Sequence, residues 1–195
     1  IYDSLAAAGF QVNETLKKFY MDTGKSGGGR ANNPSMESGV PTGIEVGETP
    51  LASYTDDVID SFKGSDAALV VISRISGEGW DLPRSMKDKN GNALAGAMSP
   101  DDHYLELDKN EQEMLKLACE HFNKVIVVIN SSNAMELGFL DSMDDHDETT
   151  IDYDFASHVD GALWIGGVGN EGILALGSIL NGAVNPSGRL TDTYV

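Results

Sequence analysis

Three runs of apolar residues along the chain each predict a buried strand. Residues 67–73 and 124–130 are almost continuously apolar and rich in Val and Ile, and residues 161–166 form a shorter run. A half-exposed strand alternates apolar with polar residues, whereas a continuous run of this length is typical of a strand covered on both faces. The sequence therefore predicts three fully buried strands.

Apolar residues at helical spacing lie between these runs and before the first of them. The clearest helix begins at Asp108, which can form a capping box with Glu111. Its apolar residues then recur at helical offsets: Leu115, Ala118, Cys119 and Phe122. Asn13 and Thr55 are the expected N-caps of two earlier helices. Further helices are predicted over residues 135–140 and 173–180.

The alternation of buried strands with helices predicts the fold class. It is typical of right-handed crossovers and of a mostly parallel sheet, so we expect a Rossmann-like or flavodoxin-like three-layer α/β/α sandwich. Ligands of such sheets bind beyond the carboxyl ends of the strands, here after Ser73, Asn130 and Gly166. Residues 23–49 and 141–154 carry no such pattern, and we expect both to be long surface loops.

Length and termini predict one domain of a larger protein. The chain has 195 residues, of which 41% are hydrophobic, which is enough for a single α/β core. It starts without Met, at Ile1, and it ends at Asp192-Thr193-Tyr194-Val195 without a helix cap or a polar tail. We interpret residues 1–195 as one sandwich domain excised from a multidomain protein.

Charge narrows the choice of partner. The formal net charge is −18, which opposes binding to nucleic acid or to an anionic membrane surface and leaves a neutral ligand such as a sugar. No apolar run approaches the roughly 20 residues that span a bilayer. The single cysteine, Cys119, is expected to be a buried apolar residue, and it leaves the cellular compartment open.

The segment after the first predicted strand holds the best candidate for catalysis. In Ser76-Gly77-Glu78-Gly79-Trp80-Asp81, two glycines bracket one carboxylate on a tight loop. A general acid needs a raised pKa, which partial burial beside an aromatic ring such as Trp80 would provide, and the same ring offers a flat face to a sugar. The residues alone leave open a second interpretation, in which Glu78 is a solvated turn residue or pairs with Arg74.

Other polar segments have ordinary explanations as well as functional ones. Residues 130–133 could bind a ligand or cap a helix, and residues 166–172 could cradle a phosphate or permit close packing of a helix. The acidic residues between Asp141 and Asp154 could bind a cation or form a solvated loop, since they lack the pattern of an EF-hand. No two histidines have the spacing of zinc ligands, so no metal or other cofactor is expected.

The order of these segments resembles a known family. A buried strand that leads into Ser76-Gly77-Glu78-Gly79, a strand that ends at Asn130, then Gly169-Asn170-Glu171-Gly172 and Asn185-Pro186-Ser187-Gly188-Arg189-Leu190 are similar to the second domain of family 3 glycoside hydrolases. The resemblance runs over nearly the whole chain.

That resemblance implies retaining hydrolysis of β-linked glucosides or xylosides by two carboxylates. Glu78 matches the acid/base glutamate, with Trp80 and Asp81 lining a sugar subsite, while the nucleophilic aspartate belongs to a (β/α)8 barrel domain of the same polypeptide. The chain departs from many relatives after Asp81, because Leu82-Pro83 intervenes before Arg84. The alternative function is a noncatalytic module that binds carbohydrate or docks against a neighbouring domain.

Overall fold

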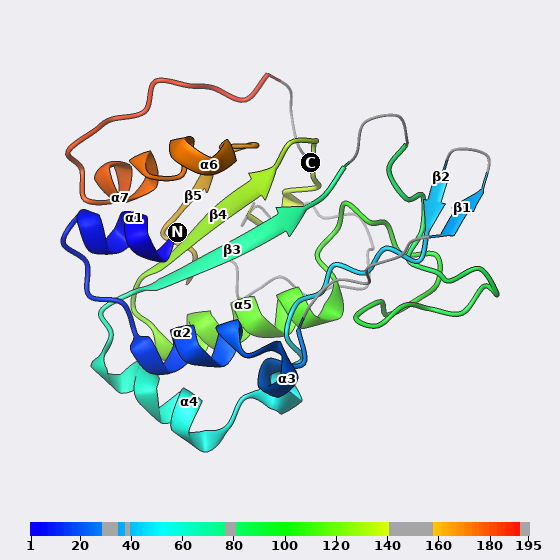
Figure 1. The fold of residues 1–195 in the computed structure, drawn as a ribbon, viewed down its shortest axis with the longest axis horizontal. Helices are drawn as coiled ribbons and strands as arrows, with labels where there is room; N and C mark the ends of the chain where they lie inside the picture. Colours follow the sequence, from blue (N-terminus) through cyan, green and yellow to red (C-terminus); the bar gives the residue numbers. More distant parts are fainter. Residues whose placement is uncertain (29–34, 38–39, 77–80, 141–157, 192–195) are drawn as a thin grey trace.

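A parallel sheet forms the centre of the molecule in a computed structural model, which describes residues 1–28, 35–37, 40–76, 81–140 and 158–191. Within these residues the sheet has three strands in the order β3-β4-β5, all parallel (Figure 1). Their bounds are Ala68–Arg74, Val125–Ser131 and Gly161–Trp164. The positions of the three predicted strands are thus confirmed to within two residues. Their full burial is not: β4 is mostly buried, but β3 alternates half-buried with buried residues and β5 is exposed or half-buried, because β3 and β5 lie at the outside of the described sheet.

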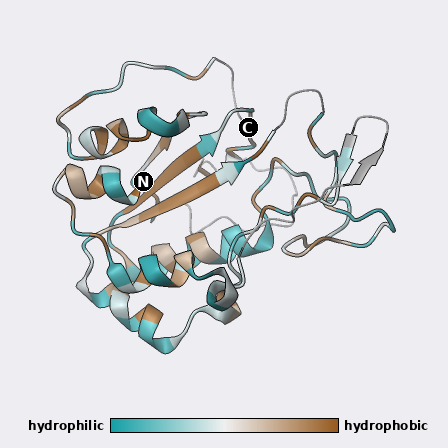
Figure 2. Ribbon diagram, viewed as in Figure 1, coloured by the Kyte–Doolittle hydropathy of each residue, from teal (hydrophilic) through white to brown (hydrophobic). Residues whose placement is uncertain are grey.

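The main core lies between this sheet and the long helix α5, Lys109–His121. Alternate residues of β4, namely Val125, Val127 and Ile129, belong to this core, whereas Val128 is equally inaccessible but points to the opposite face. Both faces of the central strand are therefore covered, which explains its unbroken apolar run (Figure 2). Cys119, expected to be buried, is half-buried against this core.

Helices lie on both sides of the sheet. Figure 1 shows α2, α4 and α5 on one side of the strands and α1, α6 and α7 on the other. The bounds of the shorter helices are Tyr2–Ala7 (α1), Glu14–Met21 (α2), Asp56–Asp60 (α4), Gly169–Gly172 (α6) and Ala175–Leu180 (α7). The predicted α/β class with a parallel sheet is confirmed.

Helix starts follow the capping residues identified in the sequence. Asn13 Oδ1 accepts hydrogen bonds from Thr15 N and Leu16 N, both at 3.1 Å, and Thr55 Oγ1 accepts one from Val58 N at 3.4 Å. Asp108 begins α5 with a complete capping box. All three predicted caps are confirmed, because each side-chain oxygen satisfies an amide that the helix itself leaves unpaired.

Two helix predictions need correction. Residues 135–140 do not form an α-helix: only a 3₁₀ turn, η3 (Gly138–Leu140), occurs there. The backbone amide of Glu136 donates instead to Leu105 O at 3.2 Å, so this segment is held by another loop. The last predicted helix, 173–180, starts two residues later, as α7. Two further 3₁₀ turns are η1, Leu51–Ser53, and η2, Ser61–Gly64.

The segment 23–49 is more structured than a simple surface loop. It contains the short helix α3, Thr23–Ser26, and an antiparallel pair formed by β1, Ser35–Glu37, and β2, Val40–Thr42. Beyond the hairpin, Ile44 and Val46 are buried in a second small core with Met86 and Tyr104. Residues 141–154, the other expected loop, lie outside the described residues.

Gly177 allows α1 and α7 to pack closely. Ser4 Oγ donates to Leu174 O at 3.0 Å and accepts from Gly177 N at 2.8 Å, and a Cβ on Gly177 would lie 2.1 Å from Ser4 O. We expect Gly177→Ala to lower the free energy of unfolding by about 1–3 kcal/mol, because the clash with backbone exceeds the gain in helix propensity. Urea unfolding measures the change.

The matched control for that variant is Gly64→Ala, where a new Cβ meets no heavy atom within 4 Å. Its unfolding free energy should stay within about 0.5 kcal/mol of the wild-type value. Equal losses in the two variants would contradict the packing explanation.

Candidate functional site

The carboxyl ends of the three parallel strands share one edge of the sheet, and the candidate site follows the first of them. Strand β3 ends at Arg74, and Ile75 and Ser76 lead from it into residues 77–80. Two of the three candidate residues, Glu78 and Trp80, lie outside the described residues. The third, Asp81, is exposed. The structure therefore describes both ends of the candidate loop.

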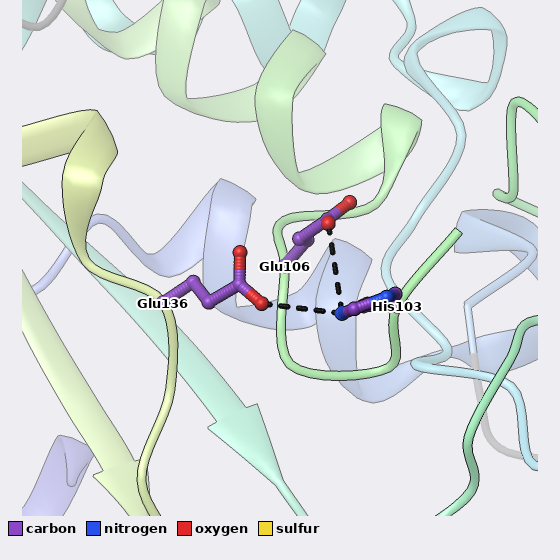
Figure 3. A group of neighbouring side chains, drawn as sticks. All are labelled: His103, Glu106 and Glu136. Carbon is purple, nitrogen blue, oxygen red and sulfur yellow. Dashed lines mark hydrogen bonds and ion pairs between the residues drawn. The ribbon is translucent and has the colours of Figure 1, made fainter. Parts of the chain in front are cut away.

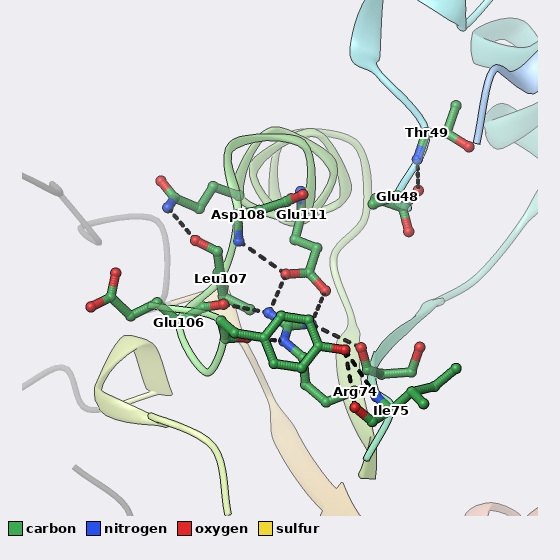
Figure 4. Close-up of polar contacts among 11 residues, drawn as sticks. Glu48, Thr49, Arg74, Ile75, Glu106, Leu107, Asp108 and Glu111 are labelled. Atoms are coloured by element: carbon green, nitrogen blue, oxygen red, sulfur yellow. Dashed lines mark hydrogen bonds and ion pairs between the residues drawn. The ribbon is translucent and has the colours of Figure 1, made fainter. Parts of the chain in front are cut away.

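Arg74 anchors the end of β3 through a buried ion pair (Figure 4). Its Nη1 lies 2.7 Å from Glu111 Oε1 and its Nη2 lies 2.8 Å from Glu111 Oε2, so the pair is bidentate. The two side chains are 0% and 2% exposed. Glu111 belongs to the first turn of α5, and the ion pair therefore fastens the strand end to the helix that covers the sheet.

The remaining hydrogen-bond donors of Arg74 are engaged by backbone carbonyls. Nε donates to Tyr104 O at 2.6 Å, Nη1 donates to Ser73 O at 2.9 Å, and Nη2 donates to Glu106 O. A guanidinium carries five N–H donors, and these three bonds plus the two to Glu111 use all of them. An ion pair between Arg74 and Glu78, one of the alternatives left open by the sequence, would thus find no free donor.

Tyr104 fixes the first residue after the strand. Its hydroxyl accepts a hydrogen bond from Ile75 N and donates one to Ile75 O, both at 3.2 Å, and its ring is 1% exposed. The ring also lies under the Arg74 guanidinium, 5.6 Å from centroid to Cζ. The chain is therefore held three residues before Glu78 by side chains that are themselves buried.

Two further carboxyl groups lie near this ion pair. Burial, followed by the charge of Glu111, raises the pKa of Asp108 to about 7, and burial also raises the pKa of Glu48 to about 7. Asp108 Oδ2 is buried without a hydrogen-bond partner among the described residues, against Gly96. Arg74 forms its ion pair with Glu111, and neither Asp108 nor Glu48 has an ion pair among the described residues, so burial raises the pKa of both groups.

Glu48 gives a pH-dependent prediction. A carboxyl whose pKa rises from 4.5 to about 7 on folding adds stability below pH 4.5 that is lost as the pH rises to 7. Glu48→Gln keeps the oxygen that accepts from Thr49 N and Tyr20 Oη but removes the charge. The variant should exceed the wild type in free energy of unfolding by less than about 1 kcal/mol at pH 5 and by roughly 3 kcal/mol at pH 8.

Urea unfolding at the two pH values measures this difference, with Glu171→Gln as the control at an exposed carboxylate. The control should follow the wild type at both values. The same difference between Glu48→Gln and the wild type at pH 5 and pH 8 would refute the assignment.

The polar cluster after β4 closes a turn. Ser131 Oγ donates to Asn133 O at 2.8 Å and accepts from Asn133 N at 3.3 Å, and Trp164 Nε1 donates to Ser131 O at 2.9 Å. No α-helix begins at this point of the described chain, so the predicted capping role is wrong. The Ser131 hydroxyl instead stabilises the turn that follows β4, and the Trp164 indole links the end of β4 to β5.

Glycines after β5 serve packing. A Cβ on Gly167 would lie 2.7 Å from Ser132 Oγ, so this glycine lets the loops after β4 and β5 touch, and Gly166 has a φ of +60°. The contact joins two loops, whereas the sequence suggested a contact between helix and sheet. The helix that follows, α6, has only four residues.

A group that the sequence did not predict lies beside the end of β3. His103, Glu106 and Glu136 bring one nitrogen and two carboxylate groups together (Figure 3). His103 and Glu136 are 33 residues apart, so no local spacing rule could have found the group.

The described helices include none that is long and apolar enough to cross a membrane.

Comparison with known proteins identifies relatives of the whole segment. The family model described as "Glycosyl hydrolase family 3 C-terminal domain" matches residues 5–195. Beta-glucosidase A of Butyrivibrio fibrisolvens is 32% identical over 159 residues, which cover 78% of this chain and 18% of that protein. Beta-glucosidase of Ruminococcus albus is 26% identical over 194 residues, which cover 99% of this chain and 17% of that protein.

The probable beta-glucosidase A of Aspergillus terreus is 26% identical over 177 residues, again 18% of its own length. The chain thus spans less than a fifth of the curated relatives that it matches. No solved structure matches the chain significantly.

Proposed function

The chain belongs to the family of glycosyl hydrolase family 3 C-terminal domains, and from this membership we propose that it supplies Glu78 as the general acid/base of a retaining β-glycosidase. Its relatives are named beta-glucosidases, which supports a β-glucoside or a related oligosaccharide as the substrate. The enzyme is then the full-length protein, and this chain is one of its domains.

Glu78 has two tasks in the proposed reaction. In the first step a carboxylate nucleophile attacks the anomeric carbon, and the Glu78 carboxyl gives its proton to the departing glycosidic oxygen. In the second step the Glu78 carboxylate takes a proton from water, which attacks the anomeric carbon and releases the nucleophile. A retaining mechanism places the two carboxyl groups about 5–5.5 Å apart, so the partner must dock directly over the loop that carries Glu78.

The observation that carries the proposal is the saturation of Arg74. A free guanidinium four residues before the general acid would stabilise its ionised form and hold its proton too weakly. Arg74 instead donates all five of its N–H groups to Glu111 and to three backbone carbonyls. Its charge is compensated inside the protein, which favours a protonated acid at the end of β3.

The rigid start of the loop supports the same proposal. Proton transfer to a bound substrate requires a side chain that is held in place, and catalytic groups are commonly presented by loops that leave a rigid scaffold. Ile75 is fixed on both its backbone N–H and its C=O by Tyr104. The loop therefore leaves the sheet from a defined point and in a defined direction.

Trp80 and Asp81 complete the proposed contribution of this chain to the sugar subsite. The indole of Trp80 offers an apolar face for stacking on a pyranose ring, and the Asp81 carboxylate can accept hydrogen bonds from sugar hydroxyls. Asp81 is exposed, as a residue that meets substrate from solvent must be in the free protein. Arg84, also exposed, follows after Leu82 and Pro83.

The nucleophile is proposed to lie on a (β/α)8 barrel domain of the same polypeptide. We therefore expect the 195-residue chain alone to hydrolyse no glucoside and to show no saturable binding of glucose or cellobiose, because only half of the site is present. Calorimetric titration of the chain with each sugar tests this expectation. The direct test of the acid/base role is Glu78→Gln in the full-length protein.

The alternative function, a noncatalytic carbohydrate-binding or docking module, predicts a different outcome of the same titration. A self-contained binding module should bind cellobiose by itself, and the binding should survive Glu78→Gln. Such a result would move the function of the chain from catalysis to substrate capture.

A further inference from the structure

Three potential metal ligands converge beside the end of β3. His103 and Glu106 lie on the loop that precedes α5, and Glu136 lies on the segment that follows β4. In Figure 3 the imidazole of His103 points toward both carboxylates. Its Nδ1 lies 3.3 Å from Glu136 Oε1 and 4.0 Å from Glu106 Oε1.

These separations suit a single small cation. Zn²⁺ binds imidazole nitrogen and carboxylate oxygen at about 2.0–2.2 Å, so two tetrahedral ligands lie about 3.4 Å apart. One ligand atom from each of the three residues falls within 4.8 Å of the others. The side chains of His103, Glu106 and Glu136 are 62%, 32% and 42% exposed, so small rotations can close the remaining gap and an ion can enter.

The charges of the group favour a cation. Among the described residues, Lys and Arg make no ion pair with Glu106 or Glu136, and the weak base His103 is the only partner with a potential positive charge. Glu106 and Glu136 both lie beside the His103 imidazole, so their two negative charges are close together and repel each other. A divalent ion would relieve this repulsion.

The backbone holds the two contributing segments in place. Glu136 N donates to Leu105 O at 3.2 Å, which sets the Glu136 segment beside the loop of His103 and Glu106. Arg74 donates to the carbonyls of Tyr104 and Glu106, which holds the same loop against the end of β3. Glu106 and Glu136 therefore project from backbone that is already fixed, which lowers the entropic cost of binding an ion.

We propose that His103, Glu106 and Glu136 form a binding site for one divalent transition-metal ion, with Zn²⁺ as the preferred probe, which cross-links the loop before α5 to the segment after β4. Imidazole nitrogen and carboxylate oxygen are both ligands that Zn²⁺ accepts, and the fourth position is left to water. Ca²⁺ and Mg²⁺ prefer oxygen ligands, so the imidazole nitrogen adds little to their affinity. The proposal does not depend on the role of Glu78.

Calorimetric titration of the chelator-treated chain with Zn²⁺ tests the site, with Mg²⁺ as the comparison. We expect saturable binding of one Zn²⁺ per chain and a shift of the His103 imidazole resonances in NMR spectra. His103→Ala and Glu136→Gln should each weaken this binding by at least about tenfold. His158→Ala, at an exposed histidine elsewhere, should leave it unchanged.

The ligands are exposed or half-exposed, so the variants should fold, and far-UV circular dichroism checks this. Glu106→Gln provides an independent variant should either of the others misfold. Absence of saturable Zn²⁺ binding by the wild type would overturn the proposal. Binding that keeps its affinity in both His103→Ala and Glu136→Gln would overturn it too, because the ion would then reside elsewhere.

Discussion

Glu78→Gln in the full-length protein is expected to lower the turnover of cellobiose by about 10²–10⁴-fold. The glucose that leaves is a poor leaving group without a proton, and glutamine keeps the size of the side chain but has no acidic proton to give. The rate constant kcat, measured at saturating cellobiose, reports the loss.

The matched control is Glu14→Gln, an exposed carboxylate in the first turn of α2. It should leave kcat within a factor of about two, since surface substitutions away from special features have small effects. Unchanged turnover in Glu78→Gln would remove Glu78 from the mechanism. A similar loss in both variants would mean that the effect reflects general damage.

Glu111→Gln is expected to lower the free energy of unfolding by about 3–5 kcal/mol, because it leaves the buried guanidinium of Arg74 without its counterion. Both carboxylate oxygens accept from Arg74, at 2.7 and 2.8 Å, and Oε2 also accepts from Asp108 N at 3.0 Å. An amide NH₂ in place of one oxygen would face a donor. The total free energy of unfolding of a domain is only about 5–15 kcal/mol, so a loss of this size is large.

Glu113→Gln provides the control on the same helix. Glu113 is half-exposed and pairs with Lys109 at 3.5 Å on the surface of α5, and its replacement should cost at most about 0.5 kcal/mol. Urea unfolding compares the two variants. Should Glu111→Gln lose no more stability than Glu113→Gln, the ion pair would not be the anchor of the β3 end.

The fold was predictable where the signal is local. The positions of the three strands follow from continuous apolar runs, although only β4 is mostly buried as such a run predicts. The caps Asn13, Thr55 and Asp108 follow from side-chain oxygens placed before periodic apolar residues. Each of these features depends on residues within a few positions of one another, and each is confirmed.

The interactions that sequence reasoning missed join distant residues. Arg74 and Glu111 are 37 residues apart, and only the packing of α5 on β3 brings them together. Residues 135–140 look helical, yet the amide of Glu136 bonds to Leu105 O, which a sequence pattern does not encode. The buried position of Glu48 arises likewise from its contact with Tyr20, 28 residues away.

The candidate site is predicted by a motif and only partly described. The sequence places Glu78 between two glycines after a strand, and the structure confirms the strand and shows that Asp81 is exposed. The roles of Glu78 and Trp80 remain predictions, since both lie outside the described residues. Saturation of Arg74 is the new argument, because Arg74 is the partner that the sequence offered for Glu78 in the noncatalytic interpretation.

The most direct test compares the loss caused by Glu78→Gln on two substrates of the full-length protein. One is cellobiose, whose leaving sugar needs a proton, and the other is an aryl β-glucoside whose phenolate leaves without one. Presteady-state measurement of the first step should show a loss of about 10²-fold or more on cellobiose and a much smaller loss on the aryl glucoside. Equal losses on the two substrates would contradict the assignment of Glu78 as the general acid.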